Sequence, residues 1–325
     1  MKIACDLYTS SIQFQVIPNK ILKKIKKIFK QTEIINVNSK KFNRNKFKIN
    51  IYWGNRISVK IINELPNLKW IHYGSTGVNK EVLMLAKSKN ILITNTRRTF
   101  DEAVSATVMS YIFTLARGIN YSFSLKEKNK LSRNFYNIIT NSIQNVFYQK
   151  IIFVGFGGIA KKLSKICKSM DMKIYGIKKN KKKIKGISFY KLSELQHAVK
   201  NKDYVINLLP FTHETKKIFN KKIFGKMKKN SFFINVGRGE TVDEKDLIDV
   251  LKKKKILGAG LDVVQNEPIQ KDSKLLNLDN LIITPHIAGI TNNYWTEQFK
   301  LFTNNLRLFI KSKKLQNTVR SEMGY

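Results

Sequence analysis

Arg238, Glu267 and His286 combine side chains that transfer protons or bind anions with positions that follow apolar runs of the sequence. Histidine titrates near neutral pH, and the planar guanidinium of arginine matches the geometry of a carboxylate. Arg238 lies in the run NVGRG, Glu267 in NEP and His286 in TPHIAG. Doubly wound sheets bind ligands at the carboxyl ends of their strands. We therefore expect these three side chains to converge on one crevice.

A glycine-rich turn, KIIFVGFGGIA at 150–160, has the spacing of a dinucleotide-binding loop. Gly155, Gly157 and Ala160 follow the pattern G-x-G-x-x-G/A directly after an apolar run and at the start of a helical pattern. The first glycine permits a sharp turn, the second lets the backbone approach a pyrophosphate, and the small third residue lets helix and strand pack closely. The N–H groups at the start of the helix would bind the phosphates. The sequence therefore predicts a dinucleotide cofactor.

The residues after the next predicted strand indicate which dinucleotide binds. An NAD site places a carboxylate at the end of this strand to hold the ribose hydroxyls. Here the strand at 173–177 is followed by Lys178 and Lys179, and Asp171 lies before it. Lysine ammonium groups attract the 2′-phosphate of NADP, which a carboxylate would repel. We expect NADP(H) to be preferred, with NAD(H) as the alternative if these lysines are only part of a solvated run.

Short apolar runs alternate with helical patterns along the chain, which predicts an α/β protein built on parallel sheets. Before residue 100, a helix is expected over 21–29 and strands at 2–7, 50–53, 68–73 and 91–94. After residue 150, six strands are expected at 151–154, 173–177, 204–208, 232–236, 260–263 and 281–284. Helices are expected at 102–117, 159–169, 244–252 and 297–311, the first buried and the last packed on the N-terminal domain.

These elements predict two doubly wound parallel-sheet domains. A Rossmann-type dinucleotide-binding domain would take residues 99–290. A smaller, flavodoxin-like substrate domain would be discontinuous and would take 1–98 and 291–325.

The positive charge is the most unusual overall property of the chain. Lys and Arg together number 61 against 22 Asp and Glu, so the formal net charge is +39, yet only nine of the 61 are Arg. A protein selected for phosphate contacts should use more arginine. Codon bias towards lysine therefore explains the charge better than a selected basic surface, and no specific nucleic-acid partner is expected.

Cysteine content and hydropathy exclude several classes of protein. Cys5 and Cys167 are too few for a disulfide framework or a four-cysteine zinc site, and no metal is expected. No run reaches the roughly 18 apolar residues of a membrane span. The N-terminus lacks the long apolar stretch of a signal peptide. We expect a cytoplasmic protein with no membrane partner.

Several motifs together resemble the D-isomer-specific 2-hydroxyacid dehydrogenases. The signature region comprises INVGRGETVDEKDL, GAGLDVVQNEP and NLIITPHIAG. The glycine loop, the segment 203–227, ITNTR at 93–97 and LKWIHYGSTGV at 68–78 also match. The C-terminal NTVRSEMGY is similar to the glyoxylate/hydroxypyruvate reductase branch. The resemblance covers nearly the whole chain.

The resemblance implies hydride transfer between NADP(H) and a small 2-keto or 2-hydroxy acid. His286 would be the acid/base, Glu267 would pair with its imidazole, and Arg238 would clamp the substrate carboxylate. The backbone N–H groups of Ser75, Thr76, Gly77 and Val78 would hold that carboxylate from the other domain, in a cleft between the two. The cofactor-binding residues would be Gly155, Gly157, Gly158, Ile159, Lys178, Lys179, Leu209, Pro210, Thr215, Val236, Gly237, Asp262 and Ala288.

The resemblance also implies finer assignments and leaves alternatives open. Asp262 would contact the nicotinamide amide, and a homodimer would form with 117–148 as its arm. One alternative activity is that of an NAD-linked dehydrogenase of a larger or phosphorylated D-2-hydroxy acid such as 3-phosphoglycerate. A non-enzymatic alternative is a nucleotide-sensing, co-repressor-like binding protein. The intact set of Arg238, Glu267 and His286 argues against that last alternative.

The other three histidines lack a matching acid. His72 adjoins the substrate loop or packs beside its strand, His197 lies in a helical segment, and His213 lies on a cofactor-side loop. The chain also departs from the family pattern twice. Ser105-Ala106 stands where Ala-Glu is common, and Arg98 replaces a usual glycine.

Overall fold

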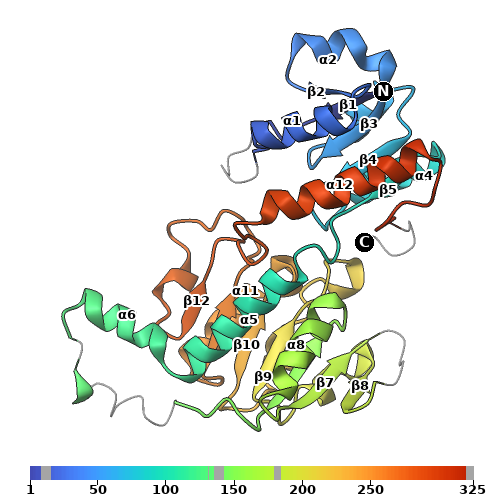
Figure 1. The fold of residues 1–325 in the computed structure, drawn as a ribbon. Coiled ribbons are helices and arrows are strands. Elements are labelled where there is room, and N and C mark those ends of the chain that lie inside the picture. The colour runs from blue at the N-terminus through green and yellow to red at the C-terminus, as the bar shows by residue number, and fades with distance from the viewer. Residues whose placement is uncertain (9–15, 131, 135–142, 179–183, 320–325) are drawn as a thin grey trace. The chain divides into compact units, whose positions relative to one another are not determined.

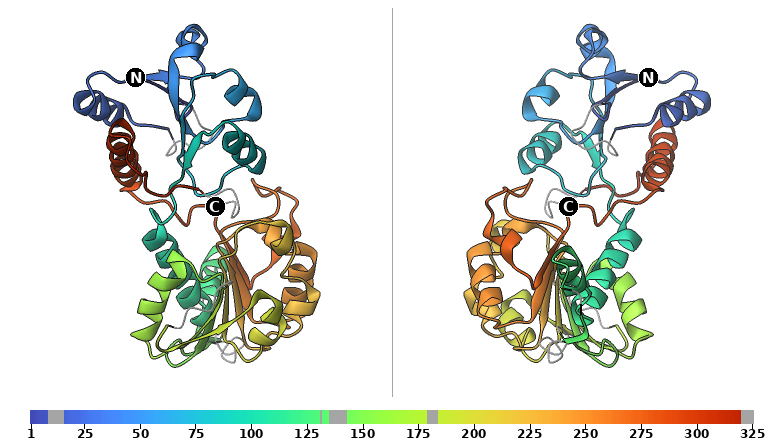
Figure 2. Two further views of the ribbon diagram at one scale, coloured as in Figure 1. Left: turned by 90° about the vertical axis from the view of Figure 1, so that its right-hand side faces the viewer. Right: turned by 90° about the vertical axis from the view of Figure 1, so that its left-hand side faces the viewer.

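The computed structural model describes residues 1–8, 16–130, 132–134, 143–178 and 184–319 of the chain. The chain forms two compact units. Unit 1 is Met1–Phe100 with Thr291–Tyr325, and unit 2 is Asp101–Ile290. Each unit has one sheet whose neighbouring strands all run parallel, with helices on both faces (Figures 1 and 2). The predicted fold class, two doubly wound α/β sheets, is confirmed.

The sheet of unit 1 has five strands in the order β2-β1-β3-β4-β5, which is the flavodoxin-like order. The strands are β1 (Lys2–Cys5), β2 (Glu33–Asn36), β3 (Ile49–Gly54), β4 (Trp70–Tyr73) and β5 (Leu92–Thr94). The sequence prediction is wrong in omitting β2. This edge strand spans only four residues, of which Ile35 alone is buried, so it carries little of the apolar signal that marks a strand.

Helices cover both faces of this sheet. One face carries α1 (Asn19–Ile28) and α12 (Tyr294–Ile310), and the other carries α2 (Lys40–Asn45), α3 (Val59–Asn63) and α4 (Lys80–Ser88), with a 3₁₀ turn η2 (Lys46–Lys48). Helix α12 buries Phe302 against Trp53, with ring centroids 3.9 Å apart. This packing confirms that the C-terminal helix returns to the N-terminal sheet.

The sheet of unit 2 has seven strands in the order β12-β11-β10-β9-β6-β7-β8. They are β6 (Lys150–Val154), β7 (Lys173–Ile177), β8 (Ile187–Tyr190), β9 (Tyr204–Asn207), β10 (Phe232–Asn235), β11 (Gly258–Leu261) and β12 (Leu281–Ile283). The predicted count of six is wrong because it omits β8. That edge strand has no fully buried residue and begins just after a lysine-rich stretch.

Two apolar cores lie on the two faces of the unit 2 sheet. One contains side chains of α5 (Asp101–Ala116) and α8 (Gly158–Lys168), and the other contains those of α9 (Leu195–Ala198), α10 (Lys221–Phe224) and α11 (Glu244–Lys252). Figure 2 shows these two sets of helices on opposite sides of the sheet. Helix α6 (Ile119–Glu127) follows α5, and 3₁₀ turns occur at η4 (Leu192–Glu194), η5 (His213–Thr215), η6 (Gly239–Thr241) and η7 (Lys274–Asn277).

The topology of unit 2 brings its motifs to one edge. The chain order reverses between β6 and β9, which are neighbours in the sheet. Because all strands are parallel, the segments that follow β6, β9, β10, β11 and β12 leave the sheet at the same edge. In doubly wound sheets this edge, at the switch point, is where ligands bind.

Within the described residues, no helix is long and apolar enough to cross a membrane.

Candidate active site

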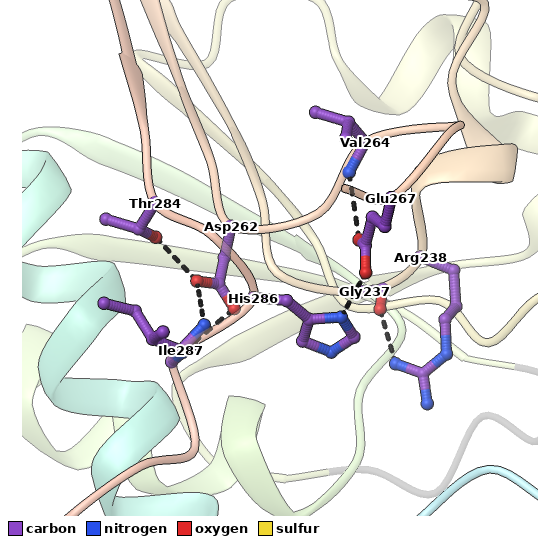
Figure 3. A network of polar contacts seen from close by, with 9 residues as sticks. Gly237, Arg238, Asp262, Val264, Glu267, Thr284, His286 and Ile287 are labelled. Atoms are coloured by element: carbon purple, nitrogen blue, oxygen red, sulfur yellow. Dashed lines mark hydrogen bonds and ion pairs between the residues drawn. The ribbon is translucent and has the colours of Figure 1, made fainter. Parts of the chain in front are cut away.

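Glu267 and His286 form a close pair at the carboxyl edge of the unit 2 sheet. Glu267 follows β11 and His286 follows β12, and the structure places Glu267 Oε2 2.7 Å from His286 Nδ1. Glu267 Oε1 also accepts a hydrogen bond from the Val264 N–H, at 3.3 Å. The His286 side chain is 52% exposed. Since Glu267 occupies Nδ1, the Nε2 atom of the ring is left to exchange a proton with another molecule (Figure 3).

The segment around His286 is held by a buried carboxylate. Asp262 is 3% exposed. Its Oδ1 accepts from the Thr284 hydroxyl at 2.6 Å and from the Ile287 N–H at 2.8 Å, and its Oδ2 accepts from the Ala288 N–H at 3.0 Å. The sequence expectation was a nicotinamide contact for Asp262. In the structure this carboxylate binds the loop that carries His286, and the nicotinamide contact stays a prediction.

A cluster of buried polar side chains binds the backbone carbonyl of Arg238. Its carbonyl accepts from Asn235 Nδ2 at 3.2 Å and from the Thr241 hydroxyl at 2.5 Å. Asn207 Nδ2 in turn donates to both Asn235 Oδ1 and Thr241 Oγ1. The half-buried Arg238 side chain lies near the Glu267–His286 pair in Figure 3, and its Nη1 donates to the Gly237 carbonyl at 2.7 Å. Among the described contacts, Arg238 bonds to neither member of that pair.

The glycine loop has a positive-φ turn at Gly155 and open space at Gly157. Gly155 has φ of +100°, and a Cβ there would lie 2.9 Å from the Leu208 carbonyl oxygen. A Cβ on Gly157 would meet no atom within 4 Å, so the loop is open where a phosphate is expected. Helix α8 begins without a side-chain cap or an acidic residue in its first turn. Its first N–H groups can therefore bind an anion. A Cβ on Gly158 would overlap the Asp101 carboxylate of α5, so that side chain would have to move.

The remaining cofactor candidates lie around the same edge. Lys178 directly follows β7, is half-buried, and its N–H donates to the Tyr190 carbonyl at 3.2 Å. Lys179 lies outside the described residues. The Thr215 hydroxyl donates to the Pro210 carbonyl at 2.7 Å and so closes the loop after β9. The other candidates are fully or partly buried beside these loops: Ile159, Leu209, Val236, Gly237 and Ala288.

In unit 1, the loop formed by Ser75, Thr76, Gly77 and Val78 follows β4. Gln298 of α12, 1% exposed, donates from Nε2 to the Gly74 carbonyl at 2.6 Å. Asn95 Nδ2 donates to the Thr76 carbonyl at 2.8 Å, and the Thr96 N–H donates to the Ser75 carbonyl at 3.2 Å. These bonds occupy the carbonyls of Gly74, Ser75 and Thr76. Within the described part of unit 1, no acceptor is bonded to the N–H groups of residues 75–78, which suits them to bind an anion.

The other histidines do not join this site. His72 is fully buried, its Nδ1 lies 2.7 Å from the Thr94 hydroxyl, and burial lowers the pKa of its imidazole to about 3. It thus packs beside its strand, as one of the two expectations had it. The His197 ring lies edge-on to the Tyr190 ring, at 6.0 Å between centroids, and His213 is exposed in η5. Within the described residues, no cluster of three His, Cys, Asp or Glu side chains could hold a metal ion.

The two departures from the family pattern have local structural roles. The hydroxyl of Ser105, which is buried in α5, donates to the Asp101 carbonyl at 2.6 Å. Arg98 has φ of +71°, the left-handed conformation in which glycine carries no steric penalty.

Sequence reasoning missed three residues that bind the functional loops: Tyr111, Gln298 and Asn207. Tyr111 bonds to Thr284 from α5, and Gln298 bonds to Gly74 from α12. Each is a buried residue that carries a polar group, and Tyr111 and Asn207 lie in elements whose other buried residues are mostly apolar. A polar group at a predicted buried position indicates that a hydrogen-bond partner exists, but the sequence does not show which residue that partner is.

Comparison with known proteins identifies the family. Residues 109–288 match the family model described as D-isomer specific 2-hydroxyacid dehydrogenase, NAD binding domain. A probable 2-ketogluconate reductase of Dictyostelium discoideum is 30% identical over 274 residues, which cover 82% of this chain and 80% of that protein. Glyoxylate/hydroxypyruvate reductase B of Escherichia coli (strain UMN026) is 27% identical over 323 residues, which cover 97% of this chain and 99% of that protein.

Solved structures agree on the fold. The NADPH-dependent glyoxylate/hydroxypyruvate reductase of Sinorhizobium meliloti, in complex with NADP and sulfate, is similar with a TM-score of 0.81 at 23% identity, covering 100% of this chain and 99% of that one. A probable 2-hydroxyacid dehydrogenase of Rhizobium etli, in complex with NADP, gives the same TM-score, identity and coverage. Since the family model spans more than half of the chain and the fold extends over all of it, this protein belongs to the D-isomer specific 2-hydroxyacid dehydrogenase family.

Proposed function

We propose that this protein is an NADPH-dependent reductase of small 2-keto acids of the glyoxylate or hydroxypyruvate type. The observation that carries the proposal is the Glu267–His286 pair, which leaves Nε2 of the histidine available at the carboxyl edge of a dinucleotide-binding sheet. The relatives named above as glyoxylate/hydroxypyruvate and 2-ketogluconate reductases support the substrate class. In this proposal unit 2 binds the cofactor and unit 1 contributes to substrate binding.

The chain's own residues then have the following roles. Arg238 binds the substrate carboxylate, and so do the N–H groups of residues 75–78, which bond to no acceptor in the described part of unit 1, because both present donors to an anion. When bound, NADPH supplies a hydride to the keto carbon. His286 gives its Nε2 proton to the carbonyl oxygen, so that the keto acid gains one hydride and one proton and becomes a hydroxy acid. Glu267 accepts from Nδ1, orients the ring and offsets the charge of the imidazolium.

The decisive assay compares initial rates for a panel of 2-keto acids with NADPH and with NADH. The panel contains glyoxylate, hydroxypyruvate, 2-ketogluconate and a phosphorylated 2-keto acid. We expect the highest kcat/KM with a small unphosphorylated acid and NADPH. No turnover of any acid with either cofactor would overturn the proposed function. Preference for the phosphorylated acid with NADH would favour the NAD-linked alternative.

Lys178 is the described residue that we propose selects NADPH. Its half-buried position at the end of β7 is where the 2′-phosphate of NADP is expected. Lys178→Ala should raise the KM for NADPH about tenfold, which is roughly one charge-assisted hydrogen bond, and leave the KM for NADH within a factor of two. The matched control is Lys173→Ala, which removes the same charge from the other end of the same strand. If both substitutions raised the KM for NADPH equally, the overall positive field of the protein, and not a contact of Lys178 with the 2′-phosphate, would explain the preference for NADPH.

A homodimer is part of the proposal, and exposed apolar side chains support it. Phe113 of α5 is 40% exposed, and Ile119 and Phe123 of α6 are 42% and 66% exposed. Large apolar side chains that are exposed on two consecutive helices are candidates for an interface between subunits. The proposed arm, 117–148, includes residues outside the described part. Light scattering should give twice the chain mass, and Phe123→Lys should reduce it to one chain; a monomeric wild-type protein would contradict the dimer.

We also propose that the protein is cytoplasmic. Its two cysteines, Cys5 and Cys167, are buried and free, and burial raises the pKa of both thiols, which keeps them unreactive. Fractionation of cells that express the tagged chain tests this location.

A further inference from the structure

The buried polar groups beneath His286 form a chain that starts on helix α5. The Tyr111 hydroxyl bonds to the Thr284 hydroxyl, and the Thr284 hydroxyl donates to Asp262 Oδ1. Thr284 has a single hydroxyl proton, which goes to the carboxylate. Tyr111 is therefore the donor in its bond to Thr284. The direction of the chain is thus fixed from Tyr111 through Thr284 to Asp262.

The chain ends on the backbone that carries His286. The His286 N–H donates to the Asp262 carbonyl at 2.9 Å, and the next two N–H groups, of Ile287 and Ala288, donate to the Asp262 carboxylate (Figure 3). His286 itself has φ of +56°. This left-handed conformation costs a non-glycine residue about 1–2 kcal/mol and persists only where surrounding contacts impose it. The three bonds to Asp262 are such contacts.

The packing of Tyr111 shows that its position is tightly constrained. Tyr111 is 3% exposed, and a Cβ on Gly260 of β11 would lie 2.7 Å from its Cγ. Glycine at position 260 therefore lets the tyrosine ring lie against the sheet, next to the strand that leads to Asp262. Burial raises the pKa of the Tyr111 hydroxyl, which keeps it protonated and able to donate. Helix α5 crosses the sheet at β10 and β11 (Figure 1).

We propose that Tyr111 and Thr284 are positioning residues that act through Asp262 to hold His286 in its left-handed conformation, with its ring against Glu267. The inference rests on the proposed function, since it assumes that His286 is the acid/base. Neither hydroxyl is assigned to the cofactor or the substrate. Their removal should therefore lower kcat while the KM values for the keto acid and NADPH change little.

The test measures kcat, both KM values and the dissociation constant of NADPH for Tyr111→Phe, Thr284→Val and the double variant. Each single variant should lose about tenfold in kcat, which corresponds to roughly 1.4 kcal/mol. Because both act through one carboxylate, the double variant should also lose about tenfold, whereas independent residues would give about 100-fold. Thr284→Ser keeps the hydroxyl and should restore most of the activity.

Tyr204→Phe is the matched control for loss of a buried tyrosine hydroxyl. Tyr204 lies in β9 of the same unit, is fully buried, and its hydroxyl has no hydrogen-bond partner in the described part of the chain. Its kcat should stay within a factor of two of wild type. Additive losses, or a change in NADPH affinity that equals the change in kcat, would overturn the proposal. So would unchanged kcat in Thr284→Val.

Amide hydrogen exchange provides a readout that does not need turnover. The Ile287 and Ala288 N–H groups are bonded to Asp262, so a peptide covering 284–290 should exchange faster in Tyr111→Phe and Thr284→Val than in wild type or Tyr204→Phe. If wild type reduces no keto acid but exchange rises as expected, the proposed function fails and the positioning network stands. If wild type is active but exchange and kcat do not change in the variants, the positioning network fails alone.

Discussion

Two histidines at the carboxyl ends of strands, His72 in unit 1 and His286 in unit 2, show what separates a structural imidazole from a reactive one. His72 is fully buried, is bonded to the neutral Thr94 hydroxyl, and has its pKa lowered to about 3 by burial. His286 is half exposed and lies 2.7 Å from the Glu267 carboxylate. Each adjoins a loop with a proposed role in binding or catalysis. Proximity to such a loop is therefore not enough, and the acid partner and the access to solvent decide the role.

The two loops are also held differently. A charged, buried group, Asp262, binds three N–H and O–H donors around His286 and leaves the imidazole on the outside. Neutral amides, Gln298 and Asn95, bind the Gly74 and Thr76 carbonyls of unit 1, and the N–H groups of residues 75–78 bond to no acceptor among the described residues of that unit. The carboxylate of Asp262, which we call the carboxylate clamp, suits a loop that must hold one side chain in place. The amides of Gln298 and Asn95, which we call the amide clamp, suit a loop whose backbone donors bind an anion.

The largest expected effect comes from replacing each of the two histidines and comparing the loss of kcat. His286→Ala should lower kcat by about 10²–10⁴-fold, the usual contribution of an acid/base group, with NADPH affinity within a factor of two of wild type. Glu267→Gln should lower kcat in the same direction but less, because the ring keeps a polar neighbour. His72→Asn, which keeps an acceptor near Thr94, should leave kcat almost unchanged. A His286→Ala enzyme with wild-type turnover would remove the basis of the contrast.

The second effect concerns stability against acid. The folded pKa of His72, about 3, lies below the value near 6.5 of the unfolded chain. Below about pH 6.5 the unfolded state binds a proton that the folded state does not, so this residue lowers stability as the pH falls from about 6.5 to about 3. Between pH 7 and pH 5 the loss should be about 2 kcal/mol.

Urea unfolding of wild type and His72→Asn at pH 7, 6 and 5 measures this effect. The variant lacks the titrating group, so the gap in unfolding free energy between the two proteins should narrow by about 2 kcal/mol as the pH falls to 5. Parallel pH profiles would show that His72 does not titrate differently in the two states.

The comparison also shows how far the sequence could predict this site. Arg238, Glu267 and His286 could be placed because each follows an apolar strand, and parallel strands share one carboxyl edge. Edge strands β2 and β8 could not be predicted, since they bury little. Tyr111 reaches Thr284 over 173 residues of sequence and Gln298 reaches Gly74 over 224. Such pairs arise from how helices pack on the sheets, and no local pattern encodes them.

The third and smallest effect tests the amide clamp. Gln298→Glu keeps the size of the side chain but replaces the donor at Nε2 by a carboxylate oxygen, which repels the Gly74 carbonyl. A buried carbonyl that loses its donor costs about 1–3 kcal/mol. The loop should shift to relieve this cost and move the N–H groups of residues 75–78. We therefore expect the KM for the keto acid to rise about tenfold. The values of kcat and of the KM for NADPH should stay near wild type, because the His286 loop is held by other groups.

Two further variants make this last result decisive. Thr303→Val removes another buried polar atom of α12, whose bonds among the described residues all stay within the helix, and should not change the KM for the keto acid. Gln298→Met removes both polar atoms without adding charge and keeps the test available if the glutamate variant fails to fold. If both variants at position 298 lowered the melting temperature as Thr303→Val does and left KM unchanged, the amide would only stabilise unit 1. A selective rise in KM would instead show that the geometry of the unit 1 loop, and not its stability, determines how well the carboxylate binds.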